Sequence, residues 1–77
     1  MAVTAYVLIK SNTSEVDRVT DEIEALDGVT SAHIVAGDVD FIAKLSVETP
    51  GEVKDIVASG IQTIGGVENT QTYIAMD

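Results

Sequence analysis

Cysteine and tryptophan are absent from this chain of 77 residues, and histidine occurs once, as His33. Without cysteine there are no disulfides, no thiolate metal ligands and no thiol nucleophile. A lone histidine cannot build a metal cluster, and no serine lies in a recognisable nucleophile elbow. Gly65-Gly66 lacks the spacing and the lysine of a phosphate-binding loop. We therefore expect no catalytic residues, no metal site and no cofactor, and we interpret His33 as an ordinary sheet or interface residue.

Basic residues are scarce. The chain has four lysines and arginines but thirteen aspartates and glutamates, which gives a net charge of −9 and a pI near 4.1. Such a chain cannot form the cationic surface that binds nucleic acid, and anionic membranes are disfavoured for the same reason. The acidic residues are spread along the whole sequence. This pattern predicts the acidic surface of a halophilic protein, with an acidic mesophilic protein as the alternative.

Long apolar runs are also missing. The run at residues 5–9 is far shorter than the ~20 residues of a membrane-spanning helix, and no signal-peptide cleavage pattern follows it, so we expect a cytoplasmic protein. Residues 1–77 have the length of one domain, and a domain of this size buries only roughly 60% of its unfolded surface. Because neither disulfides nor a metal supports this thin core, we expect a homo-oligomer.

Apolar spacing and capping residues predict two helices. Val16, Val19, Ile23 and Leu26 recur every three or four residues and form one stripe of a helix over residues 15–26, which Gly28 ends as a left-handed cap. A second helix begins at Pro50, with Thr49 as N-cap and Glu52 completing a capping box, and runs to residue 64. Gly60 inside this helix indicates a close approach to the sheet.

Four strands complete the pattern. They are predicted at residues 3–9, 29–36, 39–47 and 67–76, which gives the order β-α-β-β-α-β. Right-handed crossovers arrange this order as a ferredoxin-like α+β sandwich, a four-stranded antiparallel sheet with both helices on one face. The other face is left uncovered. It would carry some of Tyr6, Leu8, Ile34, Ile42 and Ile74, and a second copy packed sheet against sheet would cover them.

The junction between the two central strands is the most distinctive stretch. Gly37, Asp38 and Asp40 interrupt two apolar runs and predict a hairpin tip, with Gly37 free to adopt a positive φ angle. The two aspartates have three interpretations: turn residues that bond nearby backbone, a general acid–base pair, or carboxylates that bind the ammonium group of an amino-acid-like ligand. The oxygen spacing of a calcium loop is missing.

Thr70 and Thr72 lie two residues apart on the last predicted strand, so their side chains share one face of it. Threonine is favoured in strands for its shape alone. The alternative interpretation is a pair of hydroxyls that line a polar pocket near the end of the sheet.

Taken together, these motifs resemble one family along nearly the whole chain. The segments TAYVLI, LDGV, AHIVAGDVDFIAKL, IGGV and ENTQTYIAM are similar in order to the effector-binding (RAM) domain of the Lrp/AsnC transcription regulators. The most specific part is the Gly-Asp-x-Asp-aromatic junction together with the Gly-Val-x-x-Thr-x-Thr ending. Full-length members carry an N-terminal helix-turn-helix domain, and none precedes the first strand here, so the resemblance implies a stand-alone RAM domain.

The resemblance also implies an assembly and a ligand. Members are βαββαβ dimers that often form larger rings, such as an octamer or decamer, and bind amino acids or analogues at contacts between dimers. Gly37, Asp38 and Asp40 would form the loop side of that pocket, and Thr70 and Thr72 its strand side. Ala36 differs from the threonine that often precedes the glycine.

The leading hypothesis is a non-enzymatic module that binds a small amino-acid-like effector at an oligomer interface. It would act by changing its own assembly or that of full-length family members with which it associates. The first alternative is a structural or interaction protein with a vestigial pocket. Two others are an ACT-like amino-acid sensor domain and a small enzyme resembling the dimeric ferredoxin-like oxygenases, for which His33 is the sole candidate.

Overall fold

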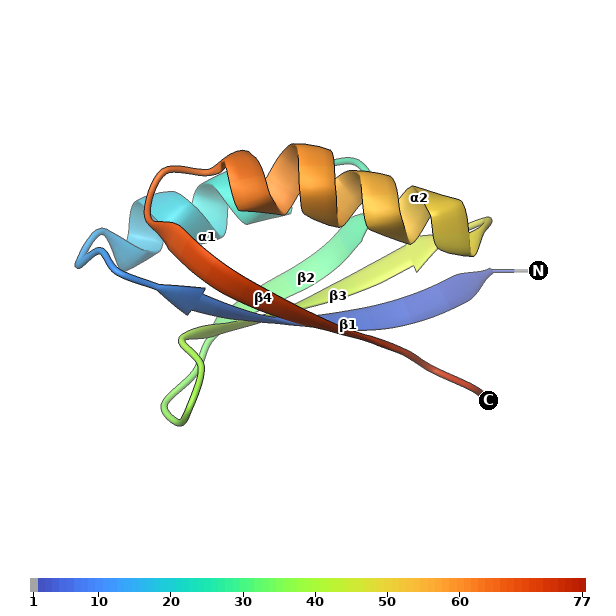
Figure 1. Cartoon of the computed structure of the whole chain (residues 1–77), viewed down its shortest axis with the longest axis horizontal. Helices are drawn as coiled ribbons and strands as arrows, with labels where there is room; N and C mark the ends of the chain where they lie inside the picture. Colours follow the sequence, from blue (N-terminus) through green and yellow to red (C-terminus); the bar gives the residue numbers. More distant parts are fainter. Residues whose placement is uncertain (1) are drawn as a thin grey trace.

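The structure is a computed structural model that describes residues 2–77. It contains one antiparallel four-stranded sheet in the order β2-β3-β1-β4, with two helices on one side of it (Figure 1). The elements in chain order are β1 (Val3–Ser11), α1 (Val16–Glu24), β2 (Val29–Ile34), β3 (Phe41–Val47), α2 (Pro50–Asp55) and β4 (Val67–Ile74). The ferredoxin-like βαββαβ arrangement predicted from the sequence is confirmed.

The core lies between the helices and the facing side of the sheet. Alternate residues of the two central strands point into it, as the period of two requires. From the helices, Val19 and Ile23 fill the same space and have no exposed surface, as their spacing predicted. The fully or nearly buried residues are Ala5, Val7, Ile9, Val19, Ile23, Ala32, Phe41, Ala43, Leu45, Val53, Val57, Ile61 and Ile64.

The turns into β2 and β4 each contain a left-handed glycine. Gly28 has φ +94° and Gly66 has φ +101°, a conformation that residues with a Cβ rarely adopt. The left-handed conformation predicted for Gly28 is confirmed. At Gly66 an added Cβ would lie 2.5 Å from Cγ2 of Thr13, so the turn before β4 packs directly on the loop that follows β1.

The second helix begins as predicted but changes its winding. Thr49 caps it, and its side chain and that of Glu52 form the reciprocal bonds of a capping box. The α-helix ends at Asp55, and the chain continues as a π turn (Ile56–Gly60) and a 3₁₀ turn (Ile61–Thr63). The prediction of one regular helix to residue 64 was therefore wrong in its second half.

Gly60 at the end of the π turn does permit a close approach, but its neighbour is not the sheet. A Cβ at this position would lie 3.0 Å from Cδ1 of Leu26, which follows α1. The missing side chain therefore lets the two helical segments pack closely against each other. The expected approach to the sheet is corrected to an approach between the helical segments.

One face of the sheet is open, as predicted, but its composition differs in part. Tyr6, Leu8 and Ile42 alternate with buried core residues and lie on this open face. Tyr73 pairs with Tyr6 and joins them there. Ile34 and Ile74, by contrast, pair with the core residues Phe41 and Ala5 and so lie at the edges of the helix-covered side. The pairing register of the strands determines on which face of the sheet each of these residues lies.

Candidate functional site

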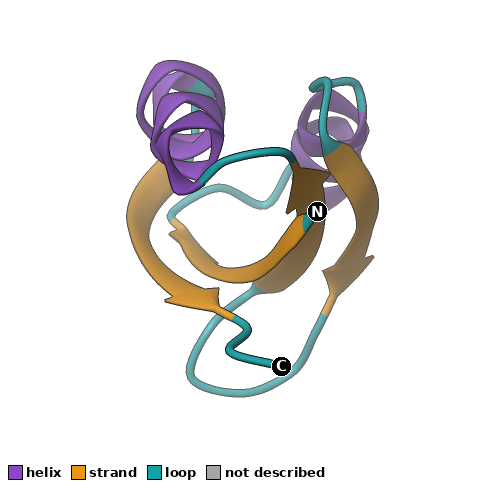
Figure 2. Ribbon diagram, turned by 90° about the vertical axis from the view of Figure 1, so that its right-hand side faces the viewer, coloured by secondary structure: helices purple, strands orange, loops and turns teal. Residues whose placement is uncertain are grey.

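The connection between β2 and β3 (residues 35–40) projects from the sheet on the side away from the helices (Figures 1 and 2). Two backbone bonds close its base: the N–H of Val35 donates to the carbonyl of Asp40, and the N–H of Asp40 donates to the carbonyl of Ile9, both at 2.9 Å. The strands thus end at Ile34 and resume at Phe41, a longer connection than the tight hairpin predicted.

Gly37 at the tip of this loop is exposed and does not have a positive φ angle, so that prediction was wrong. A longer loop can reverse its direction over several residues and does not need the left-handed turn of a two-residue hairpin. Apart from Gly37 and its two chain neighbours, no heavy atom of residues 2–77 lies within 4 Å of the place where a Cβ would be. The backbone at Gly37 is therefore open to whatever approaches the loop.

Asp40 and Asp38 have different surroundings. Asp40 is partly buried, and its Oδ2 accepts a hydrogen bond of 2.8 Å from the backbone N–H of Ser11. This contact lies where the pairing of β1 with β4 shifts register between Lys10 and Ser11. Asp40 thus satisfies a donor at an irregular strand end. Asp38 makes no such contact among residues 2–77 and is exposed.

Asp38 lines a hollow of about 220 Å³, here called the loop hollow. Its other lining residues are Leu8, Lys10, Val39, Asn69, Thr70 and Gln71. The Nζ of Lys10 donates to the backbone carbonyl of Asp38 at 3.4 Å. The loop hollow therefore offers a carboxylate, an ammonium group and two amide side chains on the open side of the sheet, groups that could bind both charges of a zwitterion.

The side chains of Thr70 and Thr72 share one face of β4. They pair with the core residues Ile9 and Val7, so this face is the helix-covered one. The hydroxyl of Thr70 accepts a 2.9 Å bond from Nε2 of Gln62. Thr70 also lines the loop hollow, although its hydroxyl is on the other side of the sheet.

Thr72 lines a different hollow, of about 400 Å³, here called the helix hollow. It lies between α2, the π turn and β4, and its lining residues are Pro50, Val53, Lys54, Val57, Ala58, Gln62, Thr72 and Ile74. Within one chain, the structure thus brings Asp38 and Thr70 to one hollow and Thr72 to another.

Lys10, Asn69 and Gln71 are site residues that no motif in the sequence indicates. Their signal is the register between β1 and β4, in which Lys10 pairs with Asn69 and Leu8 with Gln71. The sequence alone does not reveal that register, which shifts between Lys10 and Ser11 and leaves Glu68 of β4 as one extra residue opposite them.

A third hollow, of about 370 Å³, lies where β3 leads into α2. Its lining includes four acidic residues, Asp27, Glu48, Glu52 and Asp55. The Glu52 carboxylate already accepts bonds from the backbone N–H groups of Glu48 and Thr49, at 2.7 and 3.1 Å.

No group of three or more potential ligand side chains within residues 2–77 could hold a metal ion. Over the same residues, no helix is long and apolar enough to cross a membrane.

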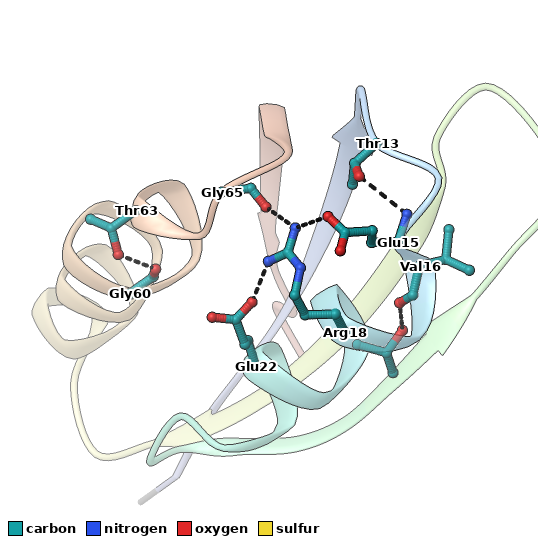
Figure 3. Close-up of polar contacts among 9 residues, drawn as sticks. Thr13, Glu15, Val16, Arg18, Glu22, Gly60, Thr63 and Gly65 are labelled. Atoms are coloured by element: carbon teal, nitrogen blue, oxygen red, sulfur yellow. Dashed lines mark hydrogen bonds and ion pairs between the residues drawn. The ribbon is translucent and has the colours of Figure 1, made fainter.

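Arg18 fixes the turn that leads into β4 (Figure 3). Its guanidinium donates to the carbonyl of Gly65 at 2.8 Å and also binds Glu22 on α1 and Glu15 at the N-cap of that helix. The hydrogen bond to Glu22 and the two nearby carboxylates raise the pKa of Arg18 above its ordinary value. This contact joins α1 to the start of the strand that carries Asn69 and Gln71.

Comparison with known proteins gives a consistent result. Residues 4–77 match the family model of the Lrp/AsnC ligand binding domain. The leucine-responsive regulatory protein of Haemophilus influenzae is 23% identical over 77 residues, which are 100% of this chain and 46% of that protein. The chain thus spans about half the length of the curated relatives that it matches.

Solved structures of other proteins share this fold. A protein from Thermus thermophilus superposes with a TM-score of 0.92 at 32% identity, over 97% of this chain and 94% of that one. A transcriptional regulator from Neisseria meningitidis, solved as a complex with L-Met, shares the fold with a TM-score of 0.83 at 13% identity, over 97% of this chain and 50% of that one. The chain therefore belongs to the Lrp/AsnC family and comprises its ligand-binding domain.

Proposed function

We propose that the chain is a non-enzymatic regulatory module that binds a small amino-acid-like effector in the loop hollow. The observation that carries this proposal is that Asp38 and Lys10, two residues of opposite charge, line one hollow on the open side of the sheet. Family membership supports ligand binding as the function of the domain. The L-Met complex of the Neisseria meningitidis regulator supports an amino acid as the class of ligand.

The two aspartates would have separate roles. Asp38 is exposed and its carboxylate is available for the ligand ammonium group, whereas Asp40 uses its carboxylate to bind the N–H of Ser11. Lys10 would bind the ligand carboxylate, because its ammonium group lines the same hollow. Charge-assisted hydrogen bonds of both signs select a zwitterion over a simple cation or anion. Gly37, which has no side chain, would let the ligand approach the loop backbone closely.

A second copy of the chain would complete the site. Tyr6 and Tyr73 are 40% and 55% exposed on the open face, and Leu8 and Ile42 lie beside them. Apolar side chains gathered on one face favour burial against a partner. Leu8 belongs both to this face and to the loop hollow, so a sheet-to-sheet dimer would bring the partner to the edge of the hollow. Effector binding could then change assembly, including association with longer family members.

Isothermal titration calorimetry of the twenty amino acids, in buffer of high salt concentration, tests this proposal. At least one should release heat, and Asp38→Asn should abolish that heat. Lys54→Met is a control for loss of an exposed charge outside the hollow and away from the open face, and Lys10→Met should weaken binding where Lys54→Met does not.

The absence of heat for all twenty amino acids, from a folded oligomer, would contradict the amino-acid function. That result would favour a structural protein with a vestigial pocket, for which Asp38→Asn would also leave partner binding unchanged.

A further inference from the structure

We infer that the helix hollow is a second ligand site, one that takes an aliphatic monocarboxylate. It lies on the helix-covered side of the sheet and shares no lining residue with the loop hollow. Val53 and Val57, almost fully buried, form its apolar floor, and the half-exposed side chain of Ile74 lies at its rim. The volume of about 400 Å³ is within the range of small-molecule sites.

Lys54 supplies the positive charge of this hollow. No carboxylate within residues 2–77 lies within ion-pair distance of it, although the chain has thirteen acidic residues. The helical positions three and four residues away on either side are occupied by Pro50, Gly51, Val57 and Ala58. Arg18 on α1, in contrast, has Glu15 and Glu22 at such positions and binds both. The ammonium group of Lys54 therefore has no acidic partner on its own helix.

Thr72 gives the hollow a second polar group. Its side chain lies on the same strand face as Thr70, but only the hydroxyl of Thr70 has a hydrogen-bond partner in the described part of the chain. The Thr72 hydroxyl can thus donate to a ligand oxygen. An ammonium group and a hydroxyl beside an aliphatic floor are complementary to a carboxylate with an aliphatic tail.

The backbone around the hollow supports a functional role. Val57 and Ala58 belong to the π turn, and such single turns within a helix occur frequently at functional sites. The wider winding follows directly on α2, and it lines the hollow together with Thr72 and Ile74 of the edge strand β4. The sequence predicts a regular helix here. The departure from regular α-helical winding lies at the residues that line the hollow.

The test is a titration of the whole chain with butyrate, hexanoate and octanoate at fixed salt concentration. Binding is monitored by two-dimensional ¹H–¹⁵N NMR. The amide signals of Lys54, Val57 and Thr72 should shift, and affinity should rise about fourfold for each added CH₂ group, because each buries more apolar surface. Hexanamide, which lacks the charge, should bind more weakly than hexanoate.

Three variants make the test specific. Lys54→Met keeps the aliphatic stem and should weaken hexanoate binding roughly tenfold while leaving hexanamide binding unchanged, since one charge-assisted bond is lost. Lys44→Met removes the same charge elsewhere and should change neither. Ala58→Phe, at an exposed position, should fill the hollow and abolish binding of both ligands.

Equal hexanoate affinity in the wild type and Lys54→Met, or shifts confined to the loop hollow, would overturn the inference. The absence of binding for all three carboxylates would overturn it as well, and a change of oligomer size in Ala58→Phe would then show that a second copy fills the hollow. Each of these results leaves the proposed role of Asp38 standing, so the inference can fail while the proposed function stands.

Discussion

The carboxylate of Asp40 accepts a hydrogen bond from the backbone N–H of Ser11, with 2.8 Å between Oδ2 and N. The contact joins the β2–β3 loop to the end of β1, two segments far apart in the sequence. It also separates two residues that the sequence presents as a pair. Asp40 holds the loop against the sheet, while Asp38 lines the loop hollow.

Asp40→Ala should therefore destabilise the fold. The loss of a partly buried charge-assisted bond should lower the free energy of unfolding by about 1.5 kcal/mol, measured by urea denaturation at fixed protein and salt concentrations. Asp38→Ala is the matched control and should stay within about 0.5 kcal/mol of the wild type. Equal effects of the two substitutions would contradict the division of roles.

Alanine substitutions at two glycines should have opposite effects. Gly66→Ala forces a left-handed φ of +101° on alanine and places its Cβ 2.5 Å from Cγ2 of Thr13. It should cost more than about 1 kcal/mol of stability. Gly37→Ala meets neither obstacle and should stabilise the chain by about 0.4–1 kcal/mol, because the unfolded chain loses conformational freedom. Thermal and urea unfolding would measure both; a destabilised Gly37→Ala would show an unsuspected constraint at the loop tip.

Ile42→Asp should prevent the proposed dimer. Ile42 lies on the open face of the central strand β3, where a buried carboxylate without a partner would be costly. Sedimentation velocity should show a monomer, while Ser14→Asp, which adds the same charge at an exposed loop position, should keep the wild-type mass. A monomeric wild type, or an Ile42→Asp variant of unchanged mass, would argue against sheet-to-sheet association.

Salt should stabilise the chain. With a net charge of −9, self-repulsion opposes the compact state, and raising the salt concentration from 0.05 to 1 M shortens the Debye length from well over 10 Å to about 3 Å. The free energy of unfolding should rise over that range. A variant with Asp17→Asn, Glu24→Gln and Glu68→Gln, all exposed positions, should show a smaller rise. A flat dependence would contradict the predicted salt adaptation.

Local signals in the sequence were sufficient to predict the order of the elements. The capping box at Thr49 and Glu52 and the left-handed conformation of Gly28 depend on neighbouring residues, and both are confirmed, although α1 itself ends earlier, with Ala25 as its C-cap. The alternation of β3 and the spacing of Val19 and Ile23 correctly predicted the core. The ferredoxin-like fold follows from these patterns, because few topologies accommodate this order of strands and helices.

The tertiary structure decided how distant segments meet. The register of β4 against β1, with its shift between Lys10 and Ser11, places Asn69 and Gln71 beside Asp38 and leaves the hydroxyls of Thr70 and Thr72 on the helix side. It also gives Asp40 a partner in Ser11, which no local pattern could indicate. The Gly-Asp-Val-Asp stretch alone was sufficient to predict that β2 ends and a loop leads to β3. Which aspartate is available to a ligand depends on contacts made across the sheet.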